Sequence, residues 1–478
     1  MSVDTYLGID LGTSGLKLSL LGGSGNVLSE AEESYDVRAP APGYAESEPR
    51  EWAHALDRAA GRLFRSAAEG RTTATRLAAV GVTGQMHGVV LADPQGAPVR
   101  PAMLWPDQRA ADVLPQWAAL PDSIRGRLGN PLVAGMPGPM LNWLHEREPA
   151  SLAEAALVTT PKDWLRGQLT GDRSGERSDA SATLLWDVVA DTWLPEALDL
   201  AGISSEVLPA LAASDAVIGR ASLPIEGAAS WEGVPVVTGA GDTAAALTAL
   251  KATGLTDAWS HCLVVNLGTG IQLLKPGVTA QPRSDPDSHL YADADAGWYQ
   301  MLAIQNGGLA LSWVQKMLGV RWEAFVELAQ ASGQPSDAVF LPFLSGERGS
   351  VACSDATAGW SQLTTTIGRP ELARSAFEAL AFTIRYGIDI LGVHHDSLLL
   401  SGGGAREPWV RQLIADVLVQ PVHYVPLRSA SAVGAAVLAA RGVGVHLPVP
   451  TTLIEVQPKR QTAGLDRAYA RWLEALKS

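Results

Sequence analysis

The chain is poor in cysteine, has no excess of basic residues and contains no long hydrophobic run. Its two cysteines, Cys262 and Cys353, lie far apart without metal-ligand spacing, which argues against a disulfide scaffold or zinc site and fits a reducing compartment. The formal net charge of -14 argues against binding to nucleic acid or an anionic membrane. Neither a membrane span nor a signal peptide is expected, so we predict a cytoplasmic protein.

Two familiar nucleotide-binding motifs are also missing. No Walker A lysine motif and no Rossmann Gly-x-Gly-x-x-Gly is found at a junction between a predicted strand and a predicted helix. The "GGSG" run at Gly22 is too short and is followed by another predicted strand. An acidic protein can still hold a phosphate with a few local amides and cations, so an anionic small ligand is not excluded.

The length of the chain and its periodicity predict an α/β protein of more than one domain. A chain of 478 residues exceeds what a single core usually contains. Apolar positions at helical spacing predict helices over 49–69 and 369–391, and these alternate with short apolar runs typical of strands. The small residues of 431–442 predict a helix suited to close packing. No Pro- or Ser-rich linker separates the halves, so we expect them to be tightly joined.

One local pattern occurs twice. "YLGIDLGTSGLKLSLL" near the start and "CLVVNLGTGIQLLKP" from Cys262 are both strand, Leu-Gly-Thr, glycine and strand, with Asp10 in the first where Asn266 stands in the second. Two such turns in equivalent places predict two halves built on one plan, each contributing a phosphate-facing turn. This pattern places the domain boundary near residue 240, which gives domains 1–240 and 241–478.

Three glycine-rich turns follow predicted strands, at 12–15, 268–270 and 402–404. Glycine allows close approach to phosphate oxygens, and the backbone N–H groups of such a turn can point at them. Thr13 and Thr269 each add a hydroxyl donor. Each turn taken alone is better explained by a purely structural role.

Two aspartates stand next to such turns. Asp242 follows a strand and a Gly-Ala-Gly turn in "VPVVTGAGDTAAALTAL", where it begins a predicted helix. It is either a helix N-cap or a carboxylate at the mouth of a cleft that accepts a hydroxyl proton. Asp10 ends the first predicted strand and could serve a magnesium ion, directly or through water. Sequence spacing leaves open whether the two aspartates face each other.

A polar tip interrupts the apolar stretch "GVTGQMHGVVL". Gln85, Met86 and His87 stand between two glycines, with a predicted strand on either side. The simplest interpretation is a loop with a solvated histidine. The alternative is that these three side chains form a functional tip, which this stretch by itself does not decide.

These segments together resemble the FGGY family of carbohydrate kinases, and within it the members that phosphorylate xylulose. The matching stretches, in family order and over nearly the whole chain, are "GIDLGTSGLK", "GVTGQMHG", "LWPDQR", "PKDWLRGQLTG", "SDASATLLWD", "GAGDTAAA", "NLGTG", "FLPFLSGER" and "SGGGAREPWVRQLIADVL". The resemblance implies two RNase H-like (actin-like ATPase) domains with an active-site cleft between them. It also implies ATP and Mg²⁺ as cofactors and a sugar as the small-molecule partner, and it allows a homodimer.

The resemblance assigns roles to individual residues. Gln85, Met86 and His87 line the sugar pocket, and Trp105, Asp107 and Arg109 complete its wall. Asp242 is the general base and also contacts the sugar, while Asp10 and Asp242 are the carboxylates on the magnesium side. The nucleotide side comprises Thr13, Lys17, Gly268, Thr269, Gly270, Gly308, Gly403, Gly404 and Ala405. Three alternatives stay open: Trp105 as a core residue, Arg109 as support for Asp107, and Lys17 as a solvated strand lysine.

The chain departs from the family pattern at several places. Met140 stands where the family usually has a lysine, Gln362 where it has a glycine, and Thr243 where asparagine is frequent. Two motifs also differ: Pro106 changes the "WNDGR"-like run, and "NLGTG" replaces a Ser-Leu-Gly-Thr-Ser form. Met140 and Thr243 bear on the choice of sugar. The leading hypothesis is phosphorylation of D-xylulose to D-xylulose 5-phosphate. The alternatives are a kinase for ribulose, a pentitol or another polyol, a non-kinase actin-like ATPase, or a sugar-binding regulator.

Overall fold

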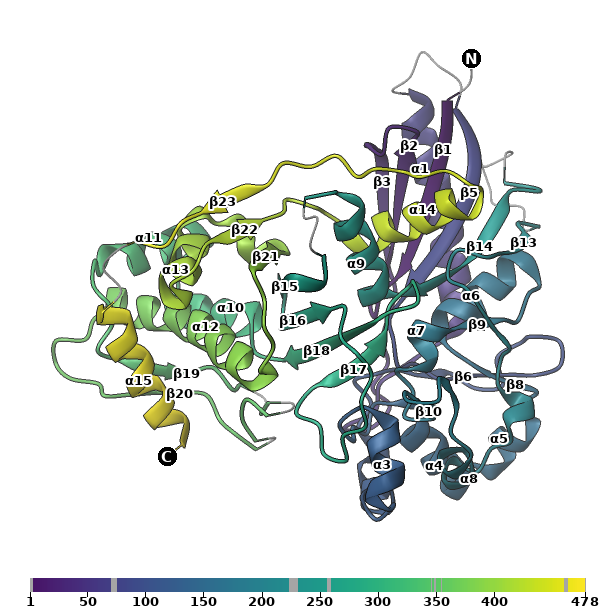
Figure 1. The fold of residues 1–478 in the computed structure, drawn as a ribbon, viewed down its shortest axis with the longest axis horizontal. Helices are drawn as coiled ribbons and strands as arrows, with labels where there is room; N and C mark the ends of the chain where they lie inside the picture. The colour runs from purple at the N-terminus through teal and green to yellow at the C-terminus, as the bar shows by residue number, and fades with distance from the viewer. Residues whose placement is uncertain are drawn as a thin grey trace.

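The protein is built from two lobes, each organised around a mixed β-sheet (Figure 1). The computed structural model describes residues 3–69, 75–222, 231–255, 259–344, 346–347, 350–353, 355–459 and 463–477. Ser345 and Arg348 of the "FLPFLSGER" stretch lie outside these ranges. Among the described residues, no helix has the length and apolar character that a membrane crossing requires.

The first sheet has the strand order β13-β14-β5-β1-β2-β3. Strands β1, β2 and β3 are joined as antiparallel hairpins, whereas β1 runs parallel to β5 and β5 parallel to β14. The strands are β1 (Val3–Leu11), β2 (Gly15–Gly22), β3 (Val27–Ser34), β5 (Thr75–Gly84), β13 (Val217–Arg220) and β14 (Pro235–Gly241). Helix α1 (Pro49–Glu69), whose range agrees with the periodicity, packs against β2 and β3.

The second sheet, ordered β17-β18-β16-β15-β21-β22-β23, repeats this plan. Strand β16 pairs antiparallel with β15 on one side and with β18 on the other. Strand β21 pairs parallel with β15 on one side and with β22 on the other. The strands are β15 (Cys262–Leu267), β16 (Ile271–Pro276), β17 (His289–Ala292), β18 (Trp298–Ile304), β21 (Ser397–Ser401), β22 (Val422–Tyr424) and β23 (Ile454–Val456). Both predicted Leu-Gly-Thr turns therefore join the first two strands of equivalent sheets, and the predicted internal repeat is confirmed.

The helices of the second lobe agree with the sequence patterns. The predicted helix 369–391 is α12 (Arg369–Leu391), and the predicted small-residue helix is α14 (Ala430–Gly442). The others are α9 (Asp242–Ala252), α10 (Gly308–Met317), α11 (Trp322–Ala331), α13 (Pro408–Leu418) and α15 (Ala463–Lys477), with the small sheet β19 (Val339–Leu341) and β20 (Gly359–Ser361). Helices α10, α11, α12, α13 and α15 share a core with the second sheet, whereas α9 and α14 belong to a different core.

Short elements between β5 and β13 extend the first lobe. The strands are β6 (Val90–Ala92), β7 (Ala102–Met103), β8 (Leu157–Thr159), β9 (Gly175–Glu176), β10 (Trp186–Asp187), β11 (Thr192–Trp193) and β12 (Leu211–Ala212), with β4 (Glu46–Ser47) pairing with β7. The helices are α2 (Leu114–Ala118), α3 (Asp122–Leu128), α4 (Pro137–Arg147), α5 (Pro149–Glu154), α6 (Pro161–Thr170), α7 (Arg177–Ala180) and α8 (Pro195–Ala201). These elements form the wall of the lobe below the first sheet in Figure 1.

Helix α14 returns from the second half of the chain to the first sheet. It packs against α9 and against β1 and β5, as Figure 1 shows. A Cβ atom on Gly8 would lie 1.7 Å from the carbonyl oxygen of Ala432, and one on Gly81 would lie 2.0 Å from that of Ala435. The helix backbone therefore lies directly on the sheet, which only glycines permit at these two positions. The division into domains 1–240 and 241–478 stays a prediction from the sequence repeat, and α14, from the second half of the chain, sits on the first sheet.

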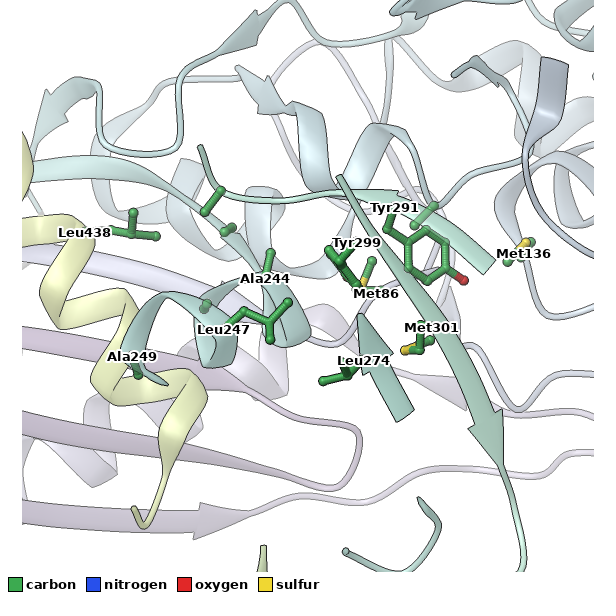
Figure 2. Close-up of a cluster of buried hydrophobic side chains, with 14 of the residues drawn as sticks. Met86, Met136, Ala244, Leu247, Ala249, Leu274, Tyr291, Tyr299, Met301 and Leu438 are labelled. Carbon is green, nitrogen blue, oxygen red and sulfur yellow. The ribbon is translucent and has the colours of Figure 1, made fainter. Parts of the chain in front are cut away.

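One hydrophobic core runs across the junction of the two lobes. Figure 2 shows Met86 of the first lobe beside Tyr291 and Tyr299 of the second, with Leu247 of α9 and Leu438 of α14 in the same cluster. These side chains are nearly or completely buried. The lobes are therefore joined through packed side chains, in agreement with the expectation of tightly joined halves.

Candidate active site

A cleft between the lobes receives side chains from both halves of the chain. Its volume is about 540 Å³. Asp10, at the end of β1, and Asp242, at the start of α9, line this same cavity. The second lobe contributes Asn266 of β15 and Gly403 after β21. The two aspartates, whose relation the sequence left open, therefore face one cavity.

Asp242 is the first residue inside α9, and Gly241 is the N-cap. The N-cap alternative for Asp242 is therefore wrong. Its Oδ1 accepts hydrogen bonds from the backbone N–H of Thr243 at 2.6 Å and from the Thr243 hydroxyl at 3.2 Å. Burial raises the pKa of Asp242 to about 6, and the two Thr243 hydrogen bonds oppose that rise. A carboxylate of this kind is mostly ionised at neutral pH and is still able to take up a proton.

Asp10 is the more strongly perturbed carboxylate. Burial and the negative charge of Asp242 raise the pKa of Asp10 to about 7, while Lys17 acts in the opposite direction. Its Oδ1 is buried and has no hydrogen-bond partner among the described residues. Buried acceptors are normally satisfied, so this oxygen fits a cation or a donor brought by a ligand.

The two carboxylates fit a magnesium ion carried by a nucleotide. No group of three or more His, Cys, Asp or Glu side chains in the described ranges could enclose a metal by itself. Mg²⁺ does not require such a cage, because it usually keeps several waters and takes one or two carboxylates together with substrate phosphates. Asp10, with its unpartnered oxygen, and Asp242 supply a donor set of that size.

The two predicted phosphate turns have matching geometry. Gly12 N–H donates to the carbonyl of Gly15 at 3.0 Å, and Gly268 N–H donates to that of Gly270 at 2.9 Å. Thr269 is exposed at the tip of the second turn. Each hydrogen bond closes the turn between two antiparallel strands. Lys17 and Asn266, which flank the two turns, line the cleft, whereas the residues of 12–15 and 268–270 do not.

Gly308 lies behind the second turn. As the first residue of α10, it donates its N–H to the carbonyl of Gly268 at 3.1 Å. A Cβ on Gly308 would lie 2.6 Å from that same oxygen. Gly308 therefore supports the turn in this structure, and its own N–H is occupied.

The third turn places only some of its residues at the cleft. Gly403 is exposed and lines the cavity, whereas Ala405 is completely buried. A Cβ on Gly404 would lie 3.1 Å from the Cβ of Leu267, so Gly404 packs against β15. Two cleft residues that the sequence did not single out are Arg406, just after the third glycine turn, and Arg428, which lies in none of the matching stretches.

The Gln-Met-His tip is fixed at its place in the first lobe. Gln85 donates its backbone N–H to the carbonyl of Leu11 at 2.8 Å and its side-chain amide to that of Gly12 at 3.2 Å. His87 is half-buried, has a backbone φ of 68° and places Nδ1 2.7 Å from the carbonyl oxygen of Ala182. A left-handed, non-glycine residue of this type is often found at a functional site. The solvated-loop interpretation is therefore wrong.

Of the predicted sugar-pocket wall, only Trp105 is open to solvent. It is 36% exposed and donates its indole N–H to the hydroxyl of Thr13 at 2.8 Å, so the core-tryptophan alternative is wrong. Asp107 is buried and accepts from Arg109 at 2.8 Å and from the backbone N–H of Ala45 at 2.7 Å. Arg109 also pairs with Glu46 at 2.7 Å, so it holds Asp107 in place.

Two tyrosines that the sequence did not single out complete the region around the tip. The hydroxyl of Tyr291 lies 3.5 Å from Nε2 of His87, and the hydroxyl of Tyr299 lies 3.9 Å from the sulfur of Met86. Burial, together with the charge of Asp242, raises the pKa of both phenols. They come from β17 and β18, far along the chain, and no local motif announces them.

Met140 and Thr243, two of the departures from the family pattern, lie in different surroundings. Met140 is completely buried in α4 and belongs to the core at the lobe junction. Thr243 lines the cleft and contacts the carboxylate of Asp242. Thr243 is therefore the departure that touches the proposed chemistry.

The fold and the cleft together define the class of two-lobed, actin-like kinases. Family models agree: residues 5–249 match the N-terminal domain, and residues 263–443 the C-terminal domain, of the FGGY family of carbohydrate kinases. The chain belongs to the FGGY family of carbohydrate kinases, in agreement with the resemblance drawn from its motifs.

Proteins that carry the name xylulose kinase are similar to this chain over almost its whole length. The xylulose kinase of Escherichia coli K12 is 34% identical over 463 residues, which span 95% of this chain and 92% of that protein. The xylulose kinase of Klebsiella pneumoniae is 32% identical over 450 residues, spanning 92% and 90%. The crystal structure of a xyloylose kinase from Brucella ovis superimposes with a TM-score of 0.88 at 30% identity and covers 99% of each chain.

Proposed function

We propose that this chain transfers the γ-phosphoryl group of ATP to D-xylulose and produces D-xylulose 5-phosphate. Membership of the carbohydrate kinase family and the xylulose kinase names of its relatives support the substrate. The observation that carries the reaction is that Asp242 lines the interlobe cleft together with Asp10, and that Gly402 and Gly403 of the third glycine turn line the same cleft. Phosphoryl transfer needs positioning and charge stabilisation of this kind.

Asp242 acts as the general base. The terminal hydroxyl of the sugar gives its proton to the carboxylate, its oxygen attacks the γ-phosphorus, and the bond to the β-phosphate oxygen breaks to release ADP. A pKa of about 6 leaves Asp242 mostly ionised at neutral pH, which is the form that accepts the proton. Thr243 holds Oδ1 through two hydrogen bonds and so fixes the direction of the carboxylate.

The nucleotide is held by the turns of both lobes. Thr13 and Thr269 supply hydroxyls, the Gly268–Gly270 turn supplies backbone N–H groups, and Gly403 borders the adenine side. Mg²⁺, when bound, neutralises charge on the phosphates, and Asp10 and Asp242 are the carboxylates that would hold it. Lys17 lies opposite Asp10 in the β1–β2 hairpin and lines the cleft while pairing with Glu32 at 3.6 Å. It is placed to approach the phosphates.

The sugar lies against the tip and Trp105. Met86 offers apolar surface, His87 the edge of its imidazole and Trp105 an aromatic face for C–H groups. Trp105 also touches Thr13, so the sugar wall and the first phosphate turn are in direct contact. This contact brings the acceptor hydroxyl and the phosphoryl donor to the same end of the cleft.

A sugar panel tests the proposal. ADP release is coupled to a spectrophotometric readout with Mg²⁺-ATP and D-xylulose, ribulose, pentitols and glycerol as acceptors. We expect the highest kcat/KM with D-xylulose. A stronger preference for another sugar would refute the xylulose assignment and leave the mechanism in place. The absence of sugar-dependent ADP release would favour a non-kinase ATPase or a sugar-binding regulator.

His87→Ala should raise the KM for the sugar about tenfold and leave the KM for ATP within about twofold, because the imidazole contributes roughly one polar contact to the sugar. Initial rates with each substrate varied in turn measure both constants. His54→Ala is the matched control, since His54 is exposed on α1 and makes only a 3.6 Å pair with Glu51. Equal increases in both constants would remove His87 from the sugar pocket.

Thr243→Val should move the acid limb of the pH–rate profile upward. The wild-type rate falls as pH drops through about 6, because a protonated Asp242 cannot act as a base. The Thr243 hydroxyl favours the carboxylate form, so its removal raises the pKa of Asp242 by about half a unit to one unit. Thr243→Ser keeps the hydroxyl and should retain the wild-type profile. An unchanged limb in Thr243→Val would show that another group sets it.

A further inference from the structure

The hydrogen bond of His87 to the main chain fixes its tautomer. Nδ1 of His87 lies 2.7 Å from the carbonyl oxygen of Ala182. A carbonyl only accepts hydrogen bonds, so in the neutral ring the proton resides on Nδ1. Nε2 is then left as the acceptor, and it is this nitrogen that faces the second lobe.

Tyr291 of the second lobe is the residue whose side chain lies next to Nε2 of His87. Its hydroxyl lies 3.5 Å from that nitrogen, and the two ring centroids are 5.7 Å apart. His289 stacks on the other side of Tyr291, with centroids 5.2 Å apart and planes inclined by 15°. Burial raises the pKa of the Tyr291 phenol, so it keeps its proton and is a donor at any working pH. Figure 2 shows the ring of Tyr291 in the same cluster as Tyr299 and Met86.

The hairpin that carries Tyr291 is attached to the first lobe on both sides of this residue. Leu290 donates its N–H to the side-chain oxygen of Asn130 at 3.2 Å, and Ala292 donates to the hydroxyl of Ser181 at 2.9 Å. Strand β17 nevertheless belongs to the sheet of the second lobe. Ser181 and Ala182 are consecutive, so one short segment holds both His87 and the hairpin of Tyr291.

We propose that Tyr291 is a positioning residue of the sugar pocket, whose hydroxyl donates to Nε2 of His87 and orients the imidazole toward the sugar. The residue acts through His87, and the inference rests on the proposed function in taking His87 as a sugar contact. The second lobe thereby contributes to sugar affinity as well as to nucleotide binding.

Kinetics of Tyr291→Phe test the coupling. The variant keeps the ring and its stacking on His289, and loses only the hydroxyl. We expect the KM for the sugar to rise about three- to tenfold, as for one lost hydrogen bond, with the KM for ATP and the melting temperature unchanged. In a His87→Ala background the same substitution should have no further effect. An unchanged sugar KM, or equal effects of Tyr291→Phe in both backgrounds, would overturn the proposal.

A matched control and a readout without substrate complete the test. Tyr469→Phe removes a buried tyrosine hydroxyl that donates to Asp389 at 3.2 Å in the second lobe, and it should leave the sugar KM unchanged.

Imidazole ¹⁵N spectra of the histidine-labelled protein should show neutral His87 protonated at Nδ1, with an Nε2 resonance that shifts in Tyr291→Phe. Protonation at Nε2 would refute the inference. Because this readout needs no sugar, it stays informative if the panel refutes the xylulose assignment.

Discussion

An Asp242→Asn variant should fold normally and lose kcat by a factor of about 10³, because a positioned general base typically contributes 10²- to 10⁴-fold. The substitution keeps the size of the side chain, and its amide oxygen can still accept the two Thr243 hydrogen bonds seen at 2.6 and 3.2 Å. What it removes is the proton acceptor. Single-turnover phosphorylation of the sugar measures the loss at the chemical step, and Asp242→Ala should show at least the same loss.

The control is a second carboxylate of the same cavity. Glu30 lines the cleft from β3, is exposed and accepts a 3.3 Å hydrogen bond from Ser19. Glu30→Gln changes the net charge by the same amount, so a general electrostatic effect would appear in both variants. We expect Glu30→Gln to retain kcat within about twofold. Full turnover in Asp242→Asn with an unchanged melting temperature would show that the base lies elsewhere.

The local features of the fold could be predicted because they are encoded locally. Helical spacing of apolar residues marked α1 and α12, and the repeated Leu-Gly-Thr run marked two equivalent hairpins. These signals depend on near neighbours in the sequence, as do helix periodicity and turn chemistry in general. The same repeat predicted two halves, and the resemblance to a known family added the active-site cleft between them.

The contacts between distant segments could not be predicted from patterns. Small residues marked α14 as a close-packing helix, but nothing local showed that it would lie on the first sheet through Gly8 and Gly81. Similarly, Tyr291 carries no motif, and it reaches His87 only because β17 is attached to the first lobe. Such pairings are set by the whole chain, which sequence periodicity does not record.

The sequence predicted which residues could form the candidate site, but it did not predict their burial or their pairing. Asp10 and Asp242 do face one cavity, although spacing could not establish it. Asp107 and Arg109 form a buried ion pair, and Ala405 is a core residue. Burial and pairing decide whether a polar residue can meet a ligand, and both depend on the tertiary structure.

Gly434→Ala should destabilise the protein by about 2 kcal/mol or more and reduce turnover. A Cβ on Gly434 would lie 1.8 Å from the carbonyl oxygen of Ala245, and a backbone atom cannot move aside like a flexible side chain. Overpacking typically costs about 1–3 kcal/mol, occasionally more, whereas the better helix propensity of alanine returns only about 1 kcal/mol. The clash therefore outweighs the propensity gain. Because Ala245 is one turn after Asp242 on α9, the displaced helix also moves the proposed base.

Denaturant unfolding and steady-state kinetics measure the two effects of Gly434→Ala. Gly359→Ala is the matched control, since a Cβ there meets nothing within 4 Å and the residue lies on the exposed strand β20. The control should change the free energy of unfolding by less than about 0.5 kcal/mol. Gly81→Ala, whose Cβ would lie 2.0 Å from the carbonyl oxygen of Ala435, should behave like Gly434→Ala. Wild-type stability in both core variants would mean that α14 does not lie against α9 and the first sheet as closely as the structure places it.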